Sequence, residues 1–171
     1  SIPIAVDVGD CLFIGTRICN VPLLASAYYV TMGFGVPAGM GVQAATGERA
    51  LVITGDGGFQ MTGWELLNCA RNRLDPIVIV LNNRGWGMLE QFSLNAGYTA
   101  FGDISYTKIA EALGGDAYTA TSCGELTEAL SSAFARRGKF QLIEAVLPKG
   151  DISTTLKSFV GALRGSNPRP Q

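Results

Sequence analysis

The sequence contains no histidine among its 171 residues. Imidazole is the usual base in Ser-His-Asp and Cys-His catalysis and a common metal ligand, so neither kind of site can be built from this chain. Any general acid or base must therefore be an aspartate, glutamate, lysine, tyrosine or cysteine, or must belong to a cofactor.

Charge is also scarce. Charged residues make up 16% of the chain, against about 25% in ordinary soluble domains, and we expect partner domains or subunits to cover part of the surface. The formal net charge of −1 supplies no basic stripe, which argues against nucleic acid as a partner.

Long apolar runs and a secretion signal are absent as well. No run approaches the roughly twenty apolar residues that a membrane helix needs, so we expect neither a membrane segment nor export. The four cysteines have no C-x-x-C pair or zinc-like spacing, and we interpret them as reduced thiols of a cytoplasmic protein. They are Cys11, Cys19, Cys69 and Cys123.

Strand-like and helix-like stretches alternate along the chain. The pattern predicts a single domain over residues 1–171 with a three-layer α/β/α fold around a mainly parallel sheet. The expected strands are 4–8, 50–54, 77–81, 117–120 and 140–147, and the expected helices are 38–45, 59–72, 106–113, 125–137 and 154–163, with a short helical stretch after Gly9-Asp10. Because the chain begins at Ser1, close to a strand, we expect it to be part of something longer.

One motif follows the second expected strand, where Gly55-Asp56-Gly57-Gly58 passes directly into a helix. Alone it is a common turn. The glycines, however, let the backbone approach a ligand closely, and the N–H groups that begin a helix favour an anion such as diphosphate. Asp56 is itself an anion, so the two can coexist if a divalent cation such as Mg²⁺ lies between them.

A second motif, Asn82-Asn83-Arg84-Gly85, ends the next expected strand. Asn83 offers an amide oxygen and Gly85 a carbonyl oxygen, both suitable for Mg²⁺. Neighbouring strands of a sheet lie about 5 Å apart, so Asp56 and Asn83 are expected to reach one ion.

The two motifs together resemble the thiamine-diphosphate motif, Gly-Asp-Gly followed after one crossover by Asn-Asn. The stretches 6–10, 33–38 and 59–62 also resemble one domain of this kind, the C-terminal, diphosphate-binding domain of 2-oxo acid decarboxylases. Within that family the chain is most similar to phenylpyruvate and indolepyruvate decarboxylases. The resemblance implies a lyase that converts an aromatic 2-oxo acid to an aldehyde and CO₂ with thiamine diphosphate and Mg²⁺.

The resemblance also implies roles for matching positions. Asp56, Asn83 and the Gly85 carbonyl would ligate Mg²⁺. Backbone N–H groups of Gly57 and Gly58 would bind the diphosphate, and Gly9 and Asp10 would line the same pocket. Met32 would support the bent cofactor, while main-chain atoms of Met32 and Val30 would hold its aminopyrimidine ring.

The chain departs from the pyruvate decarboxylase pattern in one position. Leu89 lies where those enzymes carry a glutamate near the reacting carbon, and Glu90, one residue later, is rotated by about 100° on a helix. Leu89 would line the reacting centre and suit an aromatic substrate, and no residue of this domain is assigned as the proton donor. Aromatic residues that could widen the pocket are Trp86, Phe92 and Phe159, although each also suits a core.

The family's glutamate that activates the pyrimidine ring belongs to the N-terminal domain of a neighbouring subunit. The resemblance therefore implies that this domain requires that partner, in a homodimer or homotetramer, and that it is inactive alone.

Other functions stay open from the sequence. The stretch 39–44 formally fits the dinucleotide-binding pattern G-x-G-x-x-A, but no strand precedes it. Another thiamine-diphosphate enzyme, such as an acetolactate synthase, and a non-catalytic cofactor-binding domain are the remaining alternatives. Phenylpyruvate, indolepyruvate and branched-chain substrates are not separated by the sequence.

Overall fold

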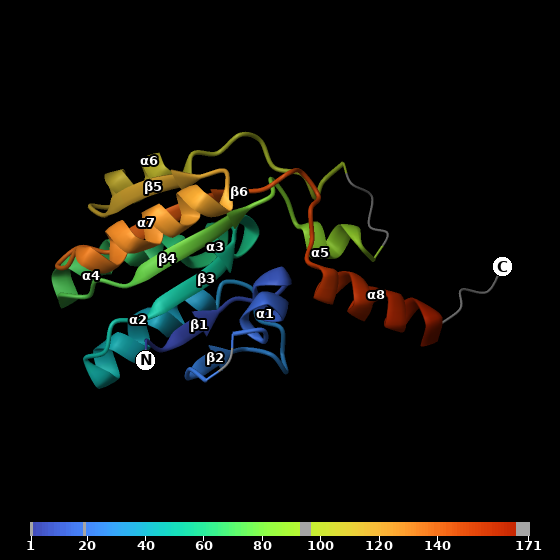
Figure 1. Cartoon of the computed structure of the whole chain (residues 1–171), viewed down its shortest axis with the longest axis horizontal. Helices are drawn as coiled ribbons and strands as arrows, with labels where there is room; N and C mark the ends of the chain where they lie inside the picture. The colour runs from blue at the N-terminus through green and yellow to red at the C-terminus, as the bar shows by residue number, and fades with distance from the viewer. Residues whose placement is uncertain (1, 19, 93–96, 167–171) are drawn as a thin grey trace.

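A six-stranded sheet forms the centre of the molecule, and all of its strands are parallel (Figure 1). The computed structural model describes residues 2–18, 20–92 and 97–166. The strands lie in the order β2-β1-β3-β4-β6-β5, with bounds β1 Ile4–Val6, β2 Leu23–Ala25, β3 Leu51–Gly55, β4 Ile77–Asn82, β5 Asp116–Ala120 and β6 Gln141–Val146.

Helices cover both faces of this sheet, which confirms the expected three-layer α/β/α fold. Those on one face are α2 (Gly35–Thr46), α3 (Asp56–Thr62), the 3₁₀ helix η1 (Gly63–Leu67), α4 (Asn68–Asn72) and α6 (Tyr106–Ala112). Those on the other face are α1 (Asp10–Gly15) and α7 (Cys123–Ala135). Helices α5 (Gly87–Glu90) and α8 (Thr154–Ser166) lie beyond the end at which the strands finish (Figure 1).

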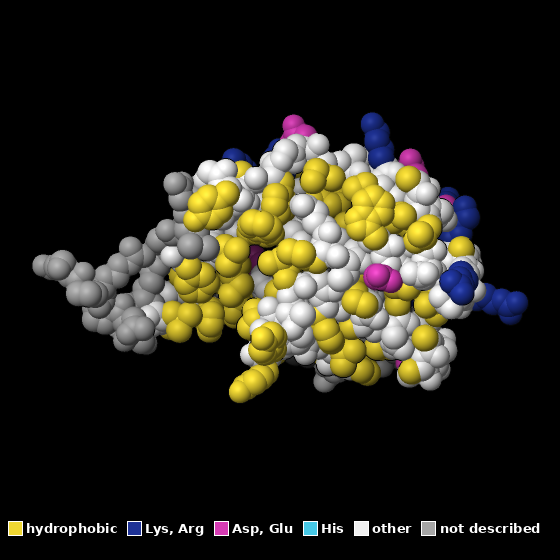
Figure 2. Space-filling model, turned by 180° about the vertical axis from the view of Figure 1, so that it is seen from behind, with side chains coloured by type: hydrophobic (Ala, Val, Ile, Leu, Met, Phe, Trp, Pro, Cys, Tyr) yellow, Lys and Arg dark blue, Asp and Glu magenta, His cyan; other side chains and the backbone are white. Residues whose placement is uncertain are grey.

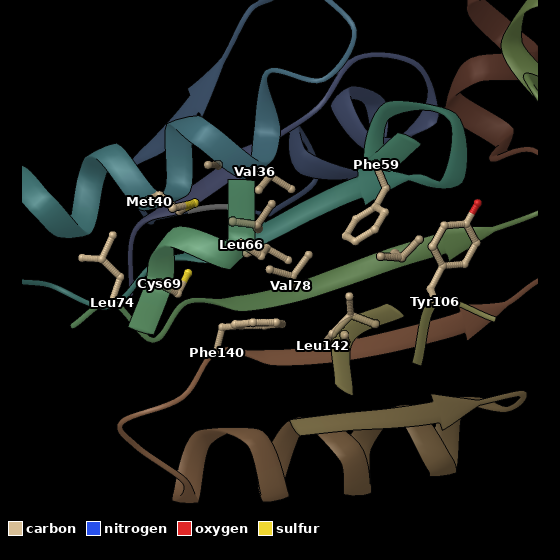
Figure 3. Close-up of a cluster of buried hydrophobic side chains, with 14 residues drawn as sticks. Val36, Met40, Phe59, Leu66, Cys69, Leu74, Val78, Tyr106, Phe140 and Leu142 are labelled. Atoms are coloured by element: carbon tan, nitrogen blue, oxygen red, sulfur yellow. The ribbon is translucent and has the colours of Figure 1, made fainter. Parts of the chain in front are cut away.

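Both faces of the sheet are apolar, because alternate residues of each strand point to opposite sides. Val52 and Val78 pack under the helices of the first face, whereas Ile53 and Ile79 pack under α1 and α7. Figure 3 shows the first cluster, in which side chains from α2, α3, η1 and α4 meet those of the central strands. A strand that is covered on both faces has a continuous run of apolar residues in its sequence. The sequence predicted β4 for this reason.

The order in which successive strands are added to the sheet reverses between β1 and β3. From β1 the chain moves outward to β2 at one edge, returns across the sheet to β3, and then continues to β4 on the other side. Ligands of open α/β sheets bind at such a reversal, beyond the carboxyl ends of the strands. The topology therefore points to the segments that follow β1 and β3.

Two local expectations were wrong. Strand β2 was not anticipated, because it is a half-exposed edge strand of three residues with no periodic pattern. The single helix expected over 59–72 is three pieces, which begin at Asp56 and change to 3₁₀ geometry at Gly63. The tighter 3₁₀ turn rotates the following residues, so Leu66 is buried while Trp64 and Leu67 are 64% and 63% exposed.

The dinucleotide-like stretch 39–44 lies inside α2 and not in a strand-to-helix turn. A Cβ atom on Gly39 would lie 2.2 Å from Cγ2 of Val52. Gly39 therefore allows α2 to approach the sheet closely, and this packing explains the glycine without a nucleotide.

At the end of the sheet where the strands begin, a buried carboxylate just before β4 joins several segments. Asp75 is 4% exposed and accepts hydrogen bonds from Gln43, Arg137 and the backbone N–H of Gly138. Burial alone would raise the pKa of Asp75, but these hydrogen bonds and the charge of Arg49 together hold it below its ordinary value.

Replacing Asp75 by asparagine should lower the free energy of unfolding at pH 7 by about 2–3 kcal/mol, because Arg137 and buried Arg49 lose their counter-charge. A depressed pKa adds stability that is complete above the pKa of an unfolded aspartate, about 4, and is lost as pH falls through the folded-state value. Urea unfolding from pH 7 to pH 3 should therefore show the difference between wild type and variant shrinking below about pH 4. A constant difference across this range would contradict the assignment.

Within the described parts of the chain, no helix is both long and apolar enough to cross a membrane. Cys11 and Cys69 are buried free thiols and Cys123 is an exposed one. Cys19 lies outside the described residues.

Candidate functional site

A cavity of about 210 Å³ opens where β1, β3 and β4 end. Its lining includes every residue to which the resemblance assigned a role in the site: Gly9, Asp10, Val30, Met32, Asp56, Gly57, Gly58, Asn83, Gly85 and Leu89. The fold brings them together because the carboxyl ends of parallel strands share one edge of the sheet. The other lining residues include Asp7, Cys11, Trp86, Met88 and Ile152.

Asp56 begins α3 and is 2% exposed. Its carboxylate accepts hydrogen bonds from the backbone N–H groups of Gly57 (2.8 Å) and Gly85 (3.0 Å), and the second of these joins α3 to the loop after β4. Burial raises the pKa of Asp56 to about 6, against the opposing effect of these hydrogen bonds. Among the described residues, no lysine or arginine forms an ion pair with it.

The glycines after Asp56 are required by their neighbours. A Cβ atom on Gly57 would lie 2.3 Å from Cδ1 of Trp86, and one on Gly58 would lie 2.8 Å from Oδ2 of Asp7. The N–H of Gly57 is already engaged by Asp56. The N–H of Gly58 lies in the first turn of α3, where the helix itself supplies no i−4 acceptor, so it can donate to a ligand.

The loop after β4 is held in an extended pairing with residues 99–101. Gly85 forms an antiparallel bridge with Ala100, and the backbone N–H of Trp86 donates to the carbonyl of Thr99 (2.9 Å). The Gly85 carbonyl accepts from the N–H of Gly87 (3.0 Å), which leaves its second lone pair for another partner. The amide nitrogen of Asn83 donates to the carbonyl of Asp151 (3.4 Å).

The loop that carries Val30 and Met32 is strained. Val30 has φ of 58° and is 49% exposed. A positive φ is a genuine outlier for a β-branched residue and costs on the order of 1–3 kcal/mol. Such strain is typical of ligand-binding segments, and here it occurs at a position that the sequence placed in the site.

Leu89 and Glu90 differ in their environments. Leu89 lines the cavity, whereas Glu90 accepts a hydrogen bond from the hydroxyl of Thr99 (2.9 Å) and is not among the lining residues. Of the three aromatic candidates, Trp86 lines the cavity, and Phe92 and Phe159 are each 40% exposed and are not among the described lining residues. Phe159 instead packs on Phe13.

The charged side chains in the described lining of the cavity are all acidic. Its described lining contains three carboxylates, Asp7, Asp10 and Asp56, and no lysine or arginine. Burial, with the negative charges of these three aspartates, raises the pKa of the Cys11 thiol well above its ordinary value. A diphosphate can enter such a cavity only together with a cation. The three aspartates do not form a metal-binding cluster among the described residues, so of these the Asp56 carboxylate, with neutral oxygens nearby, is the donor that suits a hard divalent ion.

One residue of the site was missed as a functional candidate. Asp7 appeared in the sequence only within a stretch that resembles a family, and no role was assigned to it. The sequence placed Asp7 inside an expected strand over 4–8, whereas β1 ends at Val6. Asp7 thus directly follows its strand, as Asp56 follows β3.

The family model for the thiamine pyrophosphate enzyme C-terminal TPP-binding domain matches residues 7–145. The chain belongs to this family. The match begins directly after β1, ends one residue before the end of β6 and includes every predicted site residue. It confirms thiamine diphosphate as the cofactor at the level of the family.

Curated relatives agree with this family. The chain is 49% identical over 158 residues to an indole-3-pyruvate decarboxylase of Azospirillum brasilense, a match that covers 92% of the chain and 29% of that protein. It is 31% identical over 151 residues to an alpha-keto-acid decarboxylase of Mycobacterium bovis (strain BCG / Pasteur 1173P2), with 84% and 27% covered. The chain thus spans less than a third of the length of these relatives.

Proposed function

We propose that the chain is the cofactor-binding domain of a thiamine-diphosphate-dependent decarboxylase that converts an aromatic 2-oxo acid to an aldehyde and CO₂. One observation carries this proposal beyond the family: the cavity combines three carboxylates, glycine N–H groups and an apolar wall, with no lysine or arginine in its described lining.

In this proposal Mg²⁺ is held by the carboxylate of Asp56, the amide oxygen of Asn83 and the carbonyl of Gly85. The N–H group of Gly85 already holds one oxygen of the Asp56 carboxylate beside the loop that carries Asn83. The amide nitrogen of Asn83 is used by Asp151, so the amide oxygen is the atom that we expect to face the ion. One acid and two neutral oxygens are the kind of partial ligand set that Mg²⁺ completes with phosphate oxygens and water.

In this proposal the remaining residues bind and orient the cofactor. The N–H of Gly58, and that of Gly57 once the Asp56 carboxylate turns to the ion, would donate to the diphosphate, and Gly9 and Asp10 would line its pocket. Met32 would support the bent cofactor, and backbone atoms of Met32 and Val30 would hold the aminopyrimidine. When bound, thiamine diphosphate supplies a cationic ring that accepts the electron pair released as CO₂ departs.

Leu89 would keep water from the reacting centre and accommodate an aromatic side chain. Its apolar surface favours loss of the substrate's carboxylate charge as CO₂. We also propose a cytoplasmic location, in agreement with the free thiols of Cys11, Cys69 and Cys123.

The partner in this proposal is the N-terminal, pyrimidine-binding domain of a neighbouring subunit, within a homodimer or homotetramer. The cavity volume of about 210 Å³ is below the range of about 300–1,000 Å³ that is usual for ligand sites, as expected where another domain completes the walls. Tyr28 and Tyr29, close in sequence to Val30, are 101% and 85% exposed. Figure 2 shows hydrophobic side chains spread across one face, while lysine and arginine lie toward its edges.

The test is a decarboxylase assay on the full-length protein with thiamine diphosphate and Mg²⁺. We expect CO₂ and the corresponding aldehyde from indolepyruvate or phenylpyruvate, no activity after chelation of the metal, and none from residues 1–171 alone. Formation of acetolactate from pyruvate would favour the synthase alternative. Tight cofactor binding without turnover of any 2-oxo acid would favour a non-catalytic domain.

A further inference from the structure

We propose that Asp7 is a positioning residue that fixes the loop carrying Val30 and Met32 against the ends of β1 and β3. The inference rests on the proposed function, because it assigns a role to Asp7 within the same cofactor site. Asp7 directly follows β1, is 1% exposed and lines the cavity.

The carboxylate of Asp7 accepts four hydrogen bonds, two on each oxygen. Oδ1 accepts from the backbone N–H groups of Val8 (2.9 Å) and Gly33 (3.0 Å). Oδ2 accepts from the N–H of Gly35 (3.2 Å) and the hydroxyl of Thr54 (3.1 Å). An ionised carboxylate is an acceptor only, with about four lone-pair positions, so these donors use its full capacity.

These contacts join three parts of the site. Gly33 comes directly after Met32 and Gly35 two residues later, and Thr54 comes two residues before Asp56. The same loop is held on its other side, where the hydroxyl of Thr62 donates to the carbonyl of Gly33 (2.6 Å). Asp7 and Thr62 therefore hold the loop between β1 and α3, and its position relative to Asp56 depends on both.

Asp7 also lies against α3. A Cβ atom on Gly58 would meet Oδ2 of Asp7 at 2.8 Å and the hydroxyl oxygen of Thr54 at 2.9 Å. The carboxylate thus separates the loop from the glycine whose N–H we assign to the diphosphate. A shift of Asp7 would move both sides of the cofactor site together.

Asparagine is nearly the same size as aspartate but cannot replace it here. With its oxygen at the Oδ1 position, its NH₂ group would face the N–H of Gly35, and two donors would oppose each other. With the groups exchanged, the NH₂ would face the N–H groups of Val8 and Gly33. Either orientation releases at least one backbone N–H of the loop, so Asp7→Asn tests the position of the loop with almost no change in volume.

A merely structural carboxylate would lower stability without changing the site, and Asp75 supplies that comparison. It is also buried and accepts several hydrogen bonds, but it lies before β4, at the end of the sheet away from the cavity. Asp75→Asn is therefore a matched control for the loss of a buried charge.

The experiment measures thiamine diphosphate affinity by calorimetry, at saturating Mg²⁺, in the full-length wild type and in D7N, D75N, T54V and T54S. Amide hydrogen exchange over residues 30–36 is measured in the same proteins without cofactor. We expect D7N to bind about 10- to 100-fold more weakly and to exchange faster at Gly33 and Gly35. D75N should bind as wild type does. T54V, which removes only the hydroxyl donor, should weaken binding severalfold, and T54S should restore it.

Wild-type affinity in D7N would overturn the inference. Should D7N fail to fold, T54V decides, and equal binding by T54V and T54S would overturn it as well. So would a loss of affinity in D75N as large as that in D7N, because binding would then follow stability. A wild type that does not bind thiamine diphosphate would remove the proposed function instead, while exchange at Gly33 and Gly35 would still test the contacts of Asp7.

Discussion

Replacing Asp56 by alanine is expected to weaken Mg²⁺-dependent binding of thiamine diphosphate by more than about a hundredfold and to remove decarboxylase activity. Loss of a residue that only supports a metal ligand commonly costs about 10- to 100-fold, and Asp56 is proposed as a ligand itself. Without its charge, the diphosphate would enter a cavity that offers the ion only neutral oxygens, with Asp7 and Asp10 still opposing the anion. Calorimetric titration of the full-length protein, with Mg²⁺ and with a chelator, measures the effect.

The same variant should separate loss of binding from loss of folding. Burial raises the pKa of Asp56 to about 6, so its charged form does not favour the cofactor-free fold at pH 7. Removal of that charge offsets the loss of two hydrogen bonds, and the unfolding temperature without cofactor should stay close to that of the wild type. Asp116→Asn, on a half-buried carboxylate that pairs with Arg136 and Lys139 far from the cavity lining, should leave binding unchanged. Metal-independent binding that survives Asp56→Ala would refute the magnesium assignment.

Much of the site was predictable because parallel topology turns sequence order into spatial order. Asp56 and Gly85 are 29 positions apart, yet each follows a strand, and adjacent strands bring the two within hydrogen-bonding distance. The continuous apolar run 77–81 and the glycines around Asp56 were sufficient to place both loops at one edge. Gly9, Asp10, Val30, Met32 and Leu89 came from the family resemblance; the structure places them in the same lining, and their roles stay predictions.

What the sequence did not reveal depends on contacts between distant backbone segments. The role proposed for Asp7 requires the N–H groups of Gly33 and Gly35 to point toward its carboxylate. No local sequence pattern predicts this orientation. Leu66 and not Leu67 faces the core because the helix tightens at Gly63, where a Cβ atom would lie 2.5 Å from the ring of Phe59. Periodicity assumes a regular helix and cannot anticipate such a change.

The contact between Gly57 and Trp86 leads to the second prediction of large effect. Replacing Gly57 by alanine should lower the free energy of unfolding by about 1–3 kcal/mol, the usual effect of overpacking, and should weaken thiamine diphosphate binding at least about tenfold. The new methyl group would lie 2.3 Å from Cδ1 of the Trp86 ring. That ring cannot simply move away, because Phe101 packs against it edge to face and Thr99 holds its backbone. The start of α3, with Asp56 and the N–H of Gly58, must shift instead.

A second substitution tests this explanation directly. Trp86→Leu in the Gly57→Ala protein removes the obstructing ring, so the two changes should be less damaging together than the sum of their separate effects. Gly41→Ala is the control, because no described atom beyond its chain neighbours and the backbone of α2 lies within 4 Å of its Cβ position, and it should stabilise the fold by about 0.5–1 kcal/mol. Urea unfolding and cofactor titration of the four variants measure both quantities. Strict additivity of Gly57→Ala and Trp86→Leu would show that the contact with the indole does not set the position of the Asp56 loop.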